Sequence, residues 1–239
     1  MVVSSNTLFQ FTSSLDVVKS ILLSEGFWPR YCIEYGWKKL FAVPQCCFCD
    51  IPLSAIQTHM KIYGEYGFGM EKEWGINHNV APVSGIINAS PLVKTLSGIF
   101  RAIRNNEDGK EEERKFLAFI KQYKAVYYRR TSDGVEKQIR SYPYYDEREW
   151  RYVPIELPSK MLVRVLEKKT DFDSDSESEI TKKHLCRFEA KDVRYIIVKT
   201  DNDRVELIDF INSRKEWDNN FKSILCSRII TNQLITEDI

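Results

Sequence analysis

The chain has 239 residues, of which 43% are hydrophobic and 13% aromatic, so it can bury a sizeable core. Its formal net charge of +1 excludes a general attraction to nucleic acid or to an anionic membrane, although a local patch could still bind either. No apolar run has the length that spans a bilayer, and the N-terminus lacks the basic start and apolar core of a secretory signal. We therefore expect a cytoplasmic protein, without membrane contact, whose six cysteines are thiols.

The first third of the chain predicts strands and helices in alternation. Residues 7–12 alternate apolar and polar side chains, which is typical of a strand, and Ser13 or Ser14 can cap a helix that ends near Gly26. The further elements expected here are a strand ending at Cys49, a helix over residues 54–63 and a strand over residues 67–74.

Three cysteines close together, Cys46, Cys47 and Cys49, with His59 ten residues on, suggest part of a metal site. Recognisable zinc sites need two pairs of ligands at set spacings, and this chain lacks the second pair. The cysteines also lie in a run that predicts a buried strand, where cysteine packs as a small apolar residue. We therefore expect no metal site.

The rest of the chain continues the mixture of helices and strands. Ser90 and Pro91 are typical of a helix start, and residues 131–134 are typical of a hairpin turn. A disordered acidic loop is predicted at about residues 170–182, because residues 171–179 carry five acids and almost no apolar area. The other expected elements are helices over residues 91–104 and 111–121, strands over residues 126–128, 161–166 and 195–198, and a helical C-terminal tail.

No linker rich in proline or glycine divides the chain. Residues 1–239 therefore predict a single α+β domain with a mainly antiparallel sheet and interspersed helices.

A charged stretch at residues 145–152 is the first candidate for a functional site. If residues 147–153 form a strand, Glu147, Glu149 and Arg151 share one face of it. A strand with a wholly charged face either meets water, as an edge strand with exposed ion pairs, or lines a cleft. Both alternatives stay open from these residues alone.

A second candidate is basic. Lys124, Arg129 and Arg130 are interleaved with tyrosines, a composition that single-stranded nucleic acid binds. The alternative is an ordinary solvated face, which is the commoner meaning of a charge run.

Several stretches carry a resemblance to a known family. They read Leu8-Phe9-Gln10-Phe11-Thr12, Cys49-Asp50-Ile51-Pro52-Leu53-Ser54, residues 59–63, residues 66–74 (Tyr-Gly-Phe-Gly-Met-Glu-Lys-Glu-Trp), residues 147–154 (Glu-Arg-Glu-Trp-Arg-Tyr-Val-Pro) and residues 229–231. They resemble the AbiGi family of abortive phage-resistance proteins. Such proteins are associated with toxin–antitoxin or phage-defence operons, so the resemblance implies a cognate toxin or antitoxin protein as partner. It leaves open which of the two this chain is.

A further resemblance is to ADP-ribosyltransferases, including DarT-like toxins that modify nucleic acid. Those enzymes open with a strand bearing His-x-Thr and carry a glutamate on a late strand. Here the opening strand has Gln10 and Thr12, and the late stretch has Glu147 and Glu149. Gln10 departs from the usual histidine, because glutamine can exchange hydrogen bonds with a ribose hydroxyl but carries no charge. The resemblance implies an ADP-ribosyltransferase-like fold with NAD as substrate.

The transferase resemblance implies a role for each candidate residue. Breaking the nicotinamide–ribose bond places positive charge on the sugar, which a fixed carboxylate stabilises. Glu149 is the candidate for this catalytic carboxylate, and Glu147 for orienting or deprotonating the acceptor. The candidates for binding NAD are Gln10 and Thr12 at a ribose, Arg30 at the pyrophosphate, and Tyr63 and Tyr66 stacked on nicotinamide. The alternative for both tyrosines is core packing.

Three classes of function follow from these patterns. The leading expectation is an abortive-infection toxin that transfers ADP-ribose from NAD to a macromolecular acceptor such as RNA or DNA. The alternative is a non-catalytic antitoxin or sensor that acts through protein–protein contact. The third is a nucleic-acid-binding protein without catalysis, which would use the patch at Lys124, Arg129 and Arg130.

Overall fold

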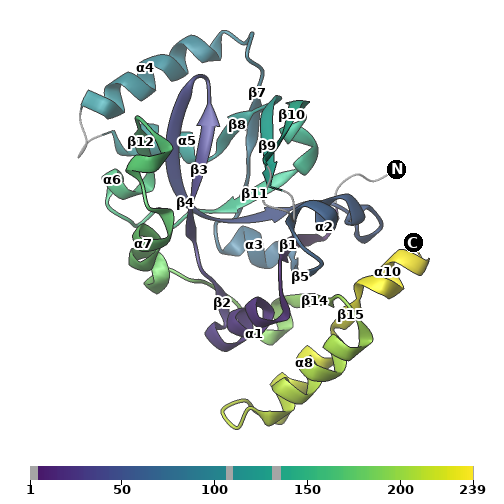
Figure 1. Ribbon diagram of the computed structural model, residues 1–239. Helices are drawn as coiled ribbons and strands as arrows, with labels where there is room; N and C mark the ends of the chain where they lie inside the picture. The colour runs from purple at the N-terminus through teal and green to yellow at the C-terminus, as the bar shows by residue number, and fades with distance from the viewer. Residues whose placement is uncertain (1–4, 106–109, 131–135, 239) are drawn as a thin grey trace. The chain divides into compact units, whose positions relative to one another are not determined.

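The computed structural model describes residues 5–105, 110–130 and 136–238. It is an α+β fold in which most strand pairs are antiparallel, so the predicted α+β class with a mainly antiparallel sheet is confirmed (Figure 1). The contacts between residues divide the chain into two compact units. The first unit comprises Met1–Trp28, Cys47–Val80 and Leu185–Ile239, and the second comprises Pro29–Cys46 and Ala81–His184. Within the described residues, no helix combines the length and the apolar character needed to cross a membrane.

Four strands of a nine-stranded sheet organise the first unit, in the order β15-β14-β5-β1. β1 (Thr7–Thr12) pairs antiparallel with β5 (Tyr66–Glu71), and β5 pairs antiparallel with β14 (Val193–Val198). β15 (Ile229–Thr231) joins β14 in the parallel direction. The strands predicted over residues 7–12 and 195–198 are thus confirmed. Gly69 permits this packing, because a Cβ there would lie 2.9 Å from each of three neighbouring side chains.

Short helices complete the first unit. Ser14 caps α1 by accepting a hydrogen bond from the Val17 amide, as its sequence position predicted. The strand predicted over residues 67–74 is wrong at its end, because the helix α3 begins at Lys72 and turns Trp74 into the core. The helices of this unit are α1 (Leu15–Ser24), α2 (Gln57–Tyr63), α3 (Lys72–Asn77), α8 (Asp201–Ser213), α9 (Asn219–Ser227) and α10 (Asn232–Asp238).

Three antiparallel strands form the frame of the second unit. β4 (Lys39–Cys49) runs between β3 (Arg30–Gly36) and β12 (Arg164–Leu166), and its last residues belong to the first unit. The amphipathic helix α4 (Leu92–Asn105) buries Leu96, Phe100 and Ile103 in the core of this unit. The smaller elements are α5 (Glu111–Ala118), α6 (Ser159–Leu162), β6 (Ala81–Pro82), β7 (Ser84–Ile86), β8 (Ile120–Gln122), β9 (Ala125–Arg130), β10 (Glu136–Tyr142) and β11 (Glu149–Tyr152).

Two predictions in the second unit are wrong at one end, and one lies partly outside the described residues. The helix predicted over residues 111–121 ends at Ala118, where the chain turns into β8, which pairs parallel with β7. The strand predicted over residues 161–166 starts as the helix α6, and the paired strand β12 begins only at Arg164. β9 and β10 pair antiparallel as a hairpin requires, but the predicted turn at residues 131–134 lies outside the described residues.

The acidic stretch at about residues 170–182 is helical in the structure, which differs from the predicted loop. Asp173 caps α7 (Ser174–Ser178) by accepting hydrogen bonds from the amides of Asp175 and Ser176. The Ser178 side chain is buried and accepts a hydrogen bond of 2.8 Å from the Tyr31 amide of β3. The composition indicated disorder because it is acidic, but Asp173 and Ser178 satisfy backbone groups, and Ser178 joins the segment to β3.

Candidate functional site

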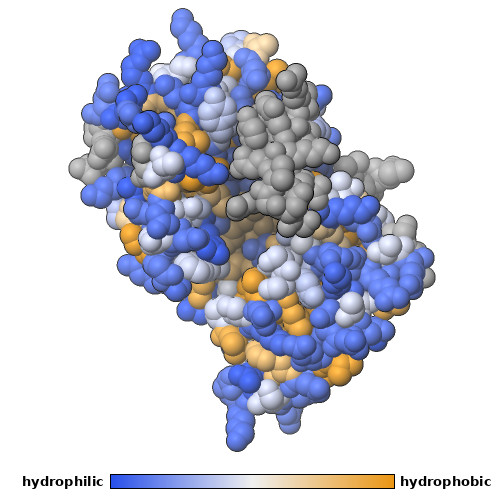
Figure 2. All heavy atoms as spheres, in the orientation of Figure 1, coloured by the Kyte–Doolittle hydropathy of each residue, from blue (hydrophilic) through white to orange (hydrophobic). Residues whose placement is uncertain are grey.

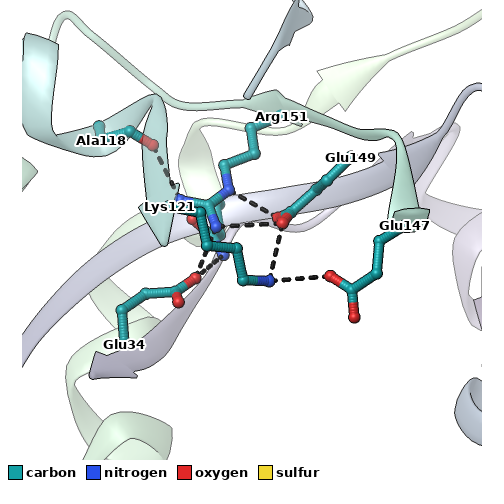
Figure 3. Close-up of polar contacts among 7 residues, drawn as sticks. Glu34, Ala118, Lys121, Glu147, Glu149 and Arg151 are labelled. Carbon is teal, nitrogen blue, oxygen red and sulfur yellow. Dashed lines mark hydrogen bonds and ion pairs between the residues drawn. The ribbon is translucent and has the colours of Figure 1, made fainter. Parts of the chain in front are cut away.

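Five charged residues of the second unit form one cluster, which consists of Glu34, Lys121, Glu147, Glu149 and Arg151 (Figure 3). Figure 3 shows the Lys121 ammonium between Glu147 and Glu149, and the Arg151 guanidinium between Glu149 and Glu34. Glu34 comes from β3, Lys121 from β8, and Glu149 and Arg151 from β11. The cluster therefore joins chain segments that lie far apart in the sequence.

The predicted strand over residues 147–153 is wrong at its start. Residues Tyr144–Glu147 form a 3-10 turn, Arg148 adopts a left-handed backbone with φ 45°, and β11 begins only at Glu149. Glu149 and Arg151 lie two residues apart on β11, so they share a face as predicted. Glu147 reaches the same ammonium from the turn rather than from the strand.

Both carboxylate oxygens of Glu149 are engaged. Its Oε1 accepts a hydrogen bond of 2.6 Å from Nε of Arg151, and its Oε2 accepts from Nζ of Lys121 at 2.9 Å and from Nη2 of Arg151 at 3.2 Å. Lys121 also donates to Glu147 at 2.9 Å, and Arg151 donates to Glu34 at 2.6 Å. The remaining terminal nitrogen of Arg151 donates to the Ala118 carbonyl at 2.9 Å. The cluster is a continuous network of charge-assisted hydrogen bonds.

Because the cluster is largely buried, the pKa values of Glu149 and Lys121 depend strongly on the charges beside them. The side chain of Arg151 is fully buried, and that of Glu149 is 8% exposed. Burial alone would raise the pKa of Glu149, but the charges of Arg151 and Lys121 and their hydrogen bonds hold that pKa well below its usual range. Burial would lower the pKa of Lys121, but Glu149, Glu34 and Glu147 hold it well above its usual value. Both groups are therefore charged throughout the physiological range of pH.

The lowered pKa of Glu149 predicts that the folded chain becomes less stable in acid. A carboxylate with a lower pKa in the folded chain contributes stability above its unfolded pKa of about 4.3, and that stability is lost as the pH falls through the folded pKa. We therefore expect the melting temperature to decrease as the pH is lowered below about 4. Glu149→Gln should flatten this fall, whereas the exposed control Glu216→Gln should keep it. Parallel curves for all three proteins, measured by circular dichroism, would contradict the assigned pKa shift.

A small pocket adjoins the cluster in the second unit. Its volume is about 150 Å³, and its lining residues include Lys121, Tyr144, Arg148, Glu149 and Trp150. The ammonium of Lys121 lies 4.4 Å from the centre of the Tyr144 ring. Pockets that bury a drug-sized ligand have volumes of roughly 300–1,000 Å³, so this pocket suits a group much smaller than a dinucleotide.

The predicted NAD-binding residues lie on several elements. Gln10 and Thr12 are on β1, and Tyr63 is the half-exposed last residue of α2. The Tyr66 hydroxyl donates a hydrogen bond of 3.3 Å to Asp203 within the first unit. Burial first and Asp203 second raise the pKa of Tyr66. These four residues belong to the first unit and Glu149 to the second, so their assembly into one NAD site stays a prediction.

Arg30 has a contact that its predicted role did not include. It opens β3 in the second unit, and its guanidinium lies 2.5 Å from the Asp175 carboxylate of α7. Both side chains are more than half exposed. The guanidinium that was expected to bind a pyrophosphate therefore holds the acidic helix in this structure.

The predicted nucleic-acid patch is described only in part. Lys124 is exposed, with its ammonium 5.9 Å from the centre of the Tyr123 ring. The side chains of Arg129 and Arg130 lie outside the described residues, although their backbone belongs to β9.

The cysteines of β4 are free thiols, and that of Cys49 donates a hydrogen bond of 3.5 Å to the Phe9 carbonyl. Cys46 and Cys49 are buried in the strand that their sequence predicted. Over the described ranges, no three histidine, cysteine, aspartate or glutamate side chains gather in a way that could hold a metal ion.

Glu34 and Lys121 are the members of the cluster that the sequence did not reveal. Lys121 lies on β8 between the buried Ile120 and Gln122, which is an unusual setting for a charge. That setting marks Lys121 as a residue in need of a partner but does not identify the partner, and Glu34 lies beside the exposed Tyr35 on β3 without such a signal.

Comparisons with known proteins place the chain in a family. A family model described as "Putative abortive phage resistance protein AbiGi, antitoxin" matches residues 26–199. The chain belongs to the AbiGi family. Abortive phage resistance protein AbiGi of Lactococcus lactis subsp. cremoris is 30% identical over 227 residues, which cover 84% of this chain and 90% of that protein. No solved structure matches the chain.

Family membership confirms one resemblance and leaves the other untested. The chain is an AbiGi-family protein of abortive phage resistance, as its sequence stretches indicated. The ADP-ribosyltransferase-like fold, the use of NAD and the modification of nucleic acid remain predictions, since no solved structure supports that fold.

Proposed function

We propose that this AbiGi-family protein is an antitoxin, which restrains a partner toxin protein by binding it and catalyses no reaction itself. The description of the matching family model, which ends with the word antitoxin, supports this role. The observation that carries the proposal is the state of Glu149, whose two carboxylate oxygens accept hydrogen bonds from Arg151 and Lys121.

The charge balance around Glu149 argues against catalysis by this residue. A carboxylate stabilises a ribosyl cation only if its negative charge faces the sugar. Here two buried cations neutralise that charge within hydrogen-bonding distance. Releasing Glu149 from this network would cost about 3–5 kcal/mol, because Arg151 and Lys121 would lose their hydrogen bonds to it in a buried setting. The cluster therefore has the properties of a structural network.

The proposal predicts that the chain is harmless when bacteria express it alone. We expect normal growth, and no transfer of label from radiolabelled NAD to RNA, DNA or protein, with and without phage. Glu149→Gln and the exposed control Glu216→Gln should behave like the parent chain in both assays. The measurements are colony counts after induction and autoradiography of cell extracts.

The transferase expectation forecasts the opposite outcome. Growth arrest together with label transfer, both abolished by Glu149→Gln but not by Glu216→Gln, would replace the antitoxin proposal. Melting curves of the two variants separate loss of catalysis from loss of fold, because a transferase variant would be inactive while still folded.

A further inference from the structure

A basic groove lies on the second unit between α4 and the β3–β4 hairpin, apart from the charged cluster. Its volume is about 720 Å³. The residues used in the argument are Tyr35, Lys38, Lys39, Arg101, Arg104 and Glu167. Figure 2 shows mainly hydrophilic side chains over the region that α4 occupies in Figure 1.

The floor of the groove follows from the strand register. Tyr35 lies opposite Leu40, and Leu40 lies opposite Leu166, so the three side chains share one face of the β3–β4–β12 sheet. Tyr35 is 64% exposed. The turn of the hairpin has left-handed residues at Trp37 and Lys38, with φ 51° and 61°. This tight turn places two consecutive lysines beside the tyrosine.

The wall of the groove is the polar face of α4. Its apolar face is buried in the core, which leaves Ser97, Arg101 and Arg104 exposed on the other side. Ser97 and the neighbouring Gly98 are small, and a Cβ at Gly98 would meet no atom within 4 Å. The two arginines therefore line the groove from the exposed face of the helix, together with the small side chain of Ser97.

The side chains that line the groove carry mainly positive charge. Four cationic side chains and one carboxylate line it, which leaves a surplus of three positive charges in a chain whose formal net charge is +1. The carboxylate, Glu167, is paired with Arg104, and both side chains are more than half exposed. Water screens such an exposed pair, so an anionic partner can compete for Arg104.

We propose that this groove binds a single strand of nucleic acid, a function that goes beyond the antitoxin role and does not depend on it. The guanidinium groups of Arg101 and Arg104 match two phosphate oxygens each, and Lys38 and Lys39 supply point charges for the backbone. The exposed ring of Tyr35 offers a face on which an unpaired base stacks. An acidic protein segment would use the cations but would not need an exposed aromatic ring among them.

Binding of fluorescein-labelled oligonucleotides of about 16 nucleotides, followed by fluorescence anisotropy, tests this proposal. The probes are single-stranded RNA, single-stranded DNA and the DNA duplex, with poly-glutamate as competitor. We expect at least one single strand to bind more tightly than the duplex. Its affinity should fall about twenty- to fiftyfold between about 50 and 200 mM salt, as three to four phosphate contacts require.

Pairs of variants with equal changes of charge show whether the strand binds in the groove. Lys39→Glu combined with Arg101→Glu should weaken binding at least about tenfold. Lys183→Glu combined with Lys215→Glu, an equal change of charge at exposed positions outside the groove lining, should leave it unchanged. Tyr35→Leu should weaken single-strand binding about fivefold to a hundredfold through lost stacking, with the fold intact because the ring is exposed.

Several results would overturn the proposal. One is that no single strand binds at the lower salt concentration, and another is that the duplex binds as tightly as a single strand. The third is that the groove and control variants lose the same amount of affinity, and the last is that poly-glutamate displaces the strands at equal charge concentration. The last result would assign the groove to an acidic protein. Each result leaves the antitoxin proposal standing, because growth and toxin binding are measured without oligonucleotides.

Discussion

Replacing Arg151 with methionine is expected to lower the free energy of unfolding by about 3–5 kcal/mol. Methionine fills much of the same volume, so the cost comes from the partners that Arg151 leaves behind. Glu149 would lose two of its three hydrogen bonds, and Glu34 and the Ala118 carbonyl would each lose one. Denaturation in urea measures the change, together with the melting temperature.

The matched control is Arg104→Met in the same unit. Arg104 also pairs with a glutamate, but both side chains are more than half exposed to water. Exposed ion pairs contribute about 0–1 kcal/mol to the free energy of unfolding, so this variant should have almost the same free energy of unfolding as the parent chain. Similar losses in the two variants would show that the buried cluster has no special role in stability.

The second large effect is expected in cells that also express a toxin. Toxicity from a gene product encoded beside this chain should disappear when the chain is co-expressed. If the chain exceeds the toxin by about 1 µM and binds it with a Kd of about 1 nM, the free toxin falls about a thousandfold. Colony counts after dual induction measure this rescue, and the toxin expressed with an empty vector supplies the reference.

Rescue by binding differs from rescue by catalysis in its dependence on dose. A stoichiometric inhibitor restores growth only when its amount matches or exceeds that of the toxin, whereas an enzyme acts below that ratio. Full rescue at a small fraction of the toxin concentration, determined by quantitative immunoblotting, would contradict inhibition by binding.

Local patterns predicted much of the fold. The alternation in residues 7–12 and the apolar run at residues 195–198 correspond to β1 and β14, because the side chains of a strand face opposite sides in turn. Strand and helix ends were less predictable. The expected strand over residues 67–74 ends at Glu71, and the chain continues as the helix α3, which buries Trp74.

The candidate site was predictable only on one strand. The two-residue spacing of Glu149 and Arg151 indicated a shared face, and the structure bears this out. Their other partners come from distant segments: Glu34 is separated from Arg151 by 117 positions, and Lys121 from Glu149 by 28. A single sequence gives no such distances, so it could not show whether Glu149 was open to a substrate or neutralised by cations.

The acidic segment shows the limit of reasoning from composition. Five acids and little apolar area indicated disorder, because such a segment offsets little of its ordering entropy. The structure instead caps α7 with Asp173 and joins Ser178 to the backbone of β3. These are polar contacts specific to particular residues, which a count of acids and apolar groups leaves out.

The most direct test of the antitoxin proposal is size-exclusion chromatography of this purified chain with the purified product of a neighbouring gene that is toxic when it is expressed alone. We predict that the two proteins elute together as one complex at micromolar concentration, and that added chain removes the free toxin peak in proportion to its amount. Elution as two separate peaks over the same concentrations, by a chain that is folded according to circular dichroism, would contradict the claim that it acts by binding the toxin.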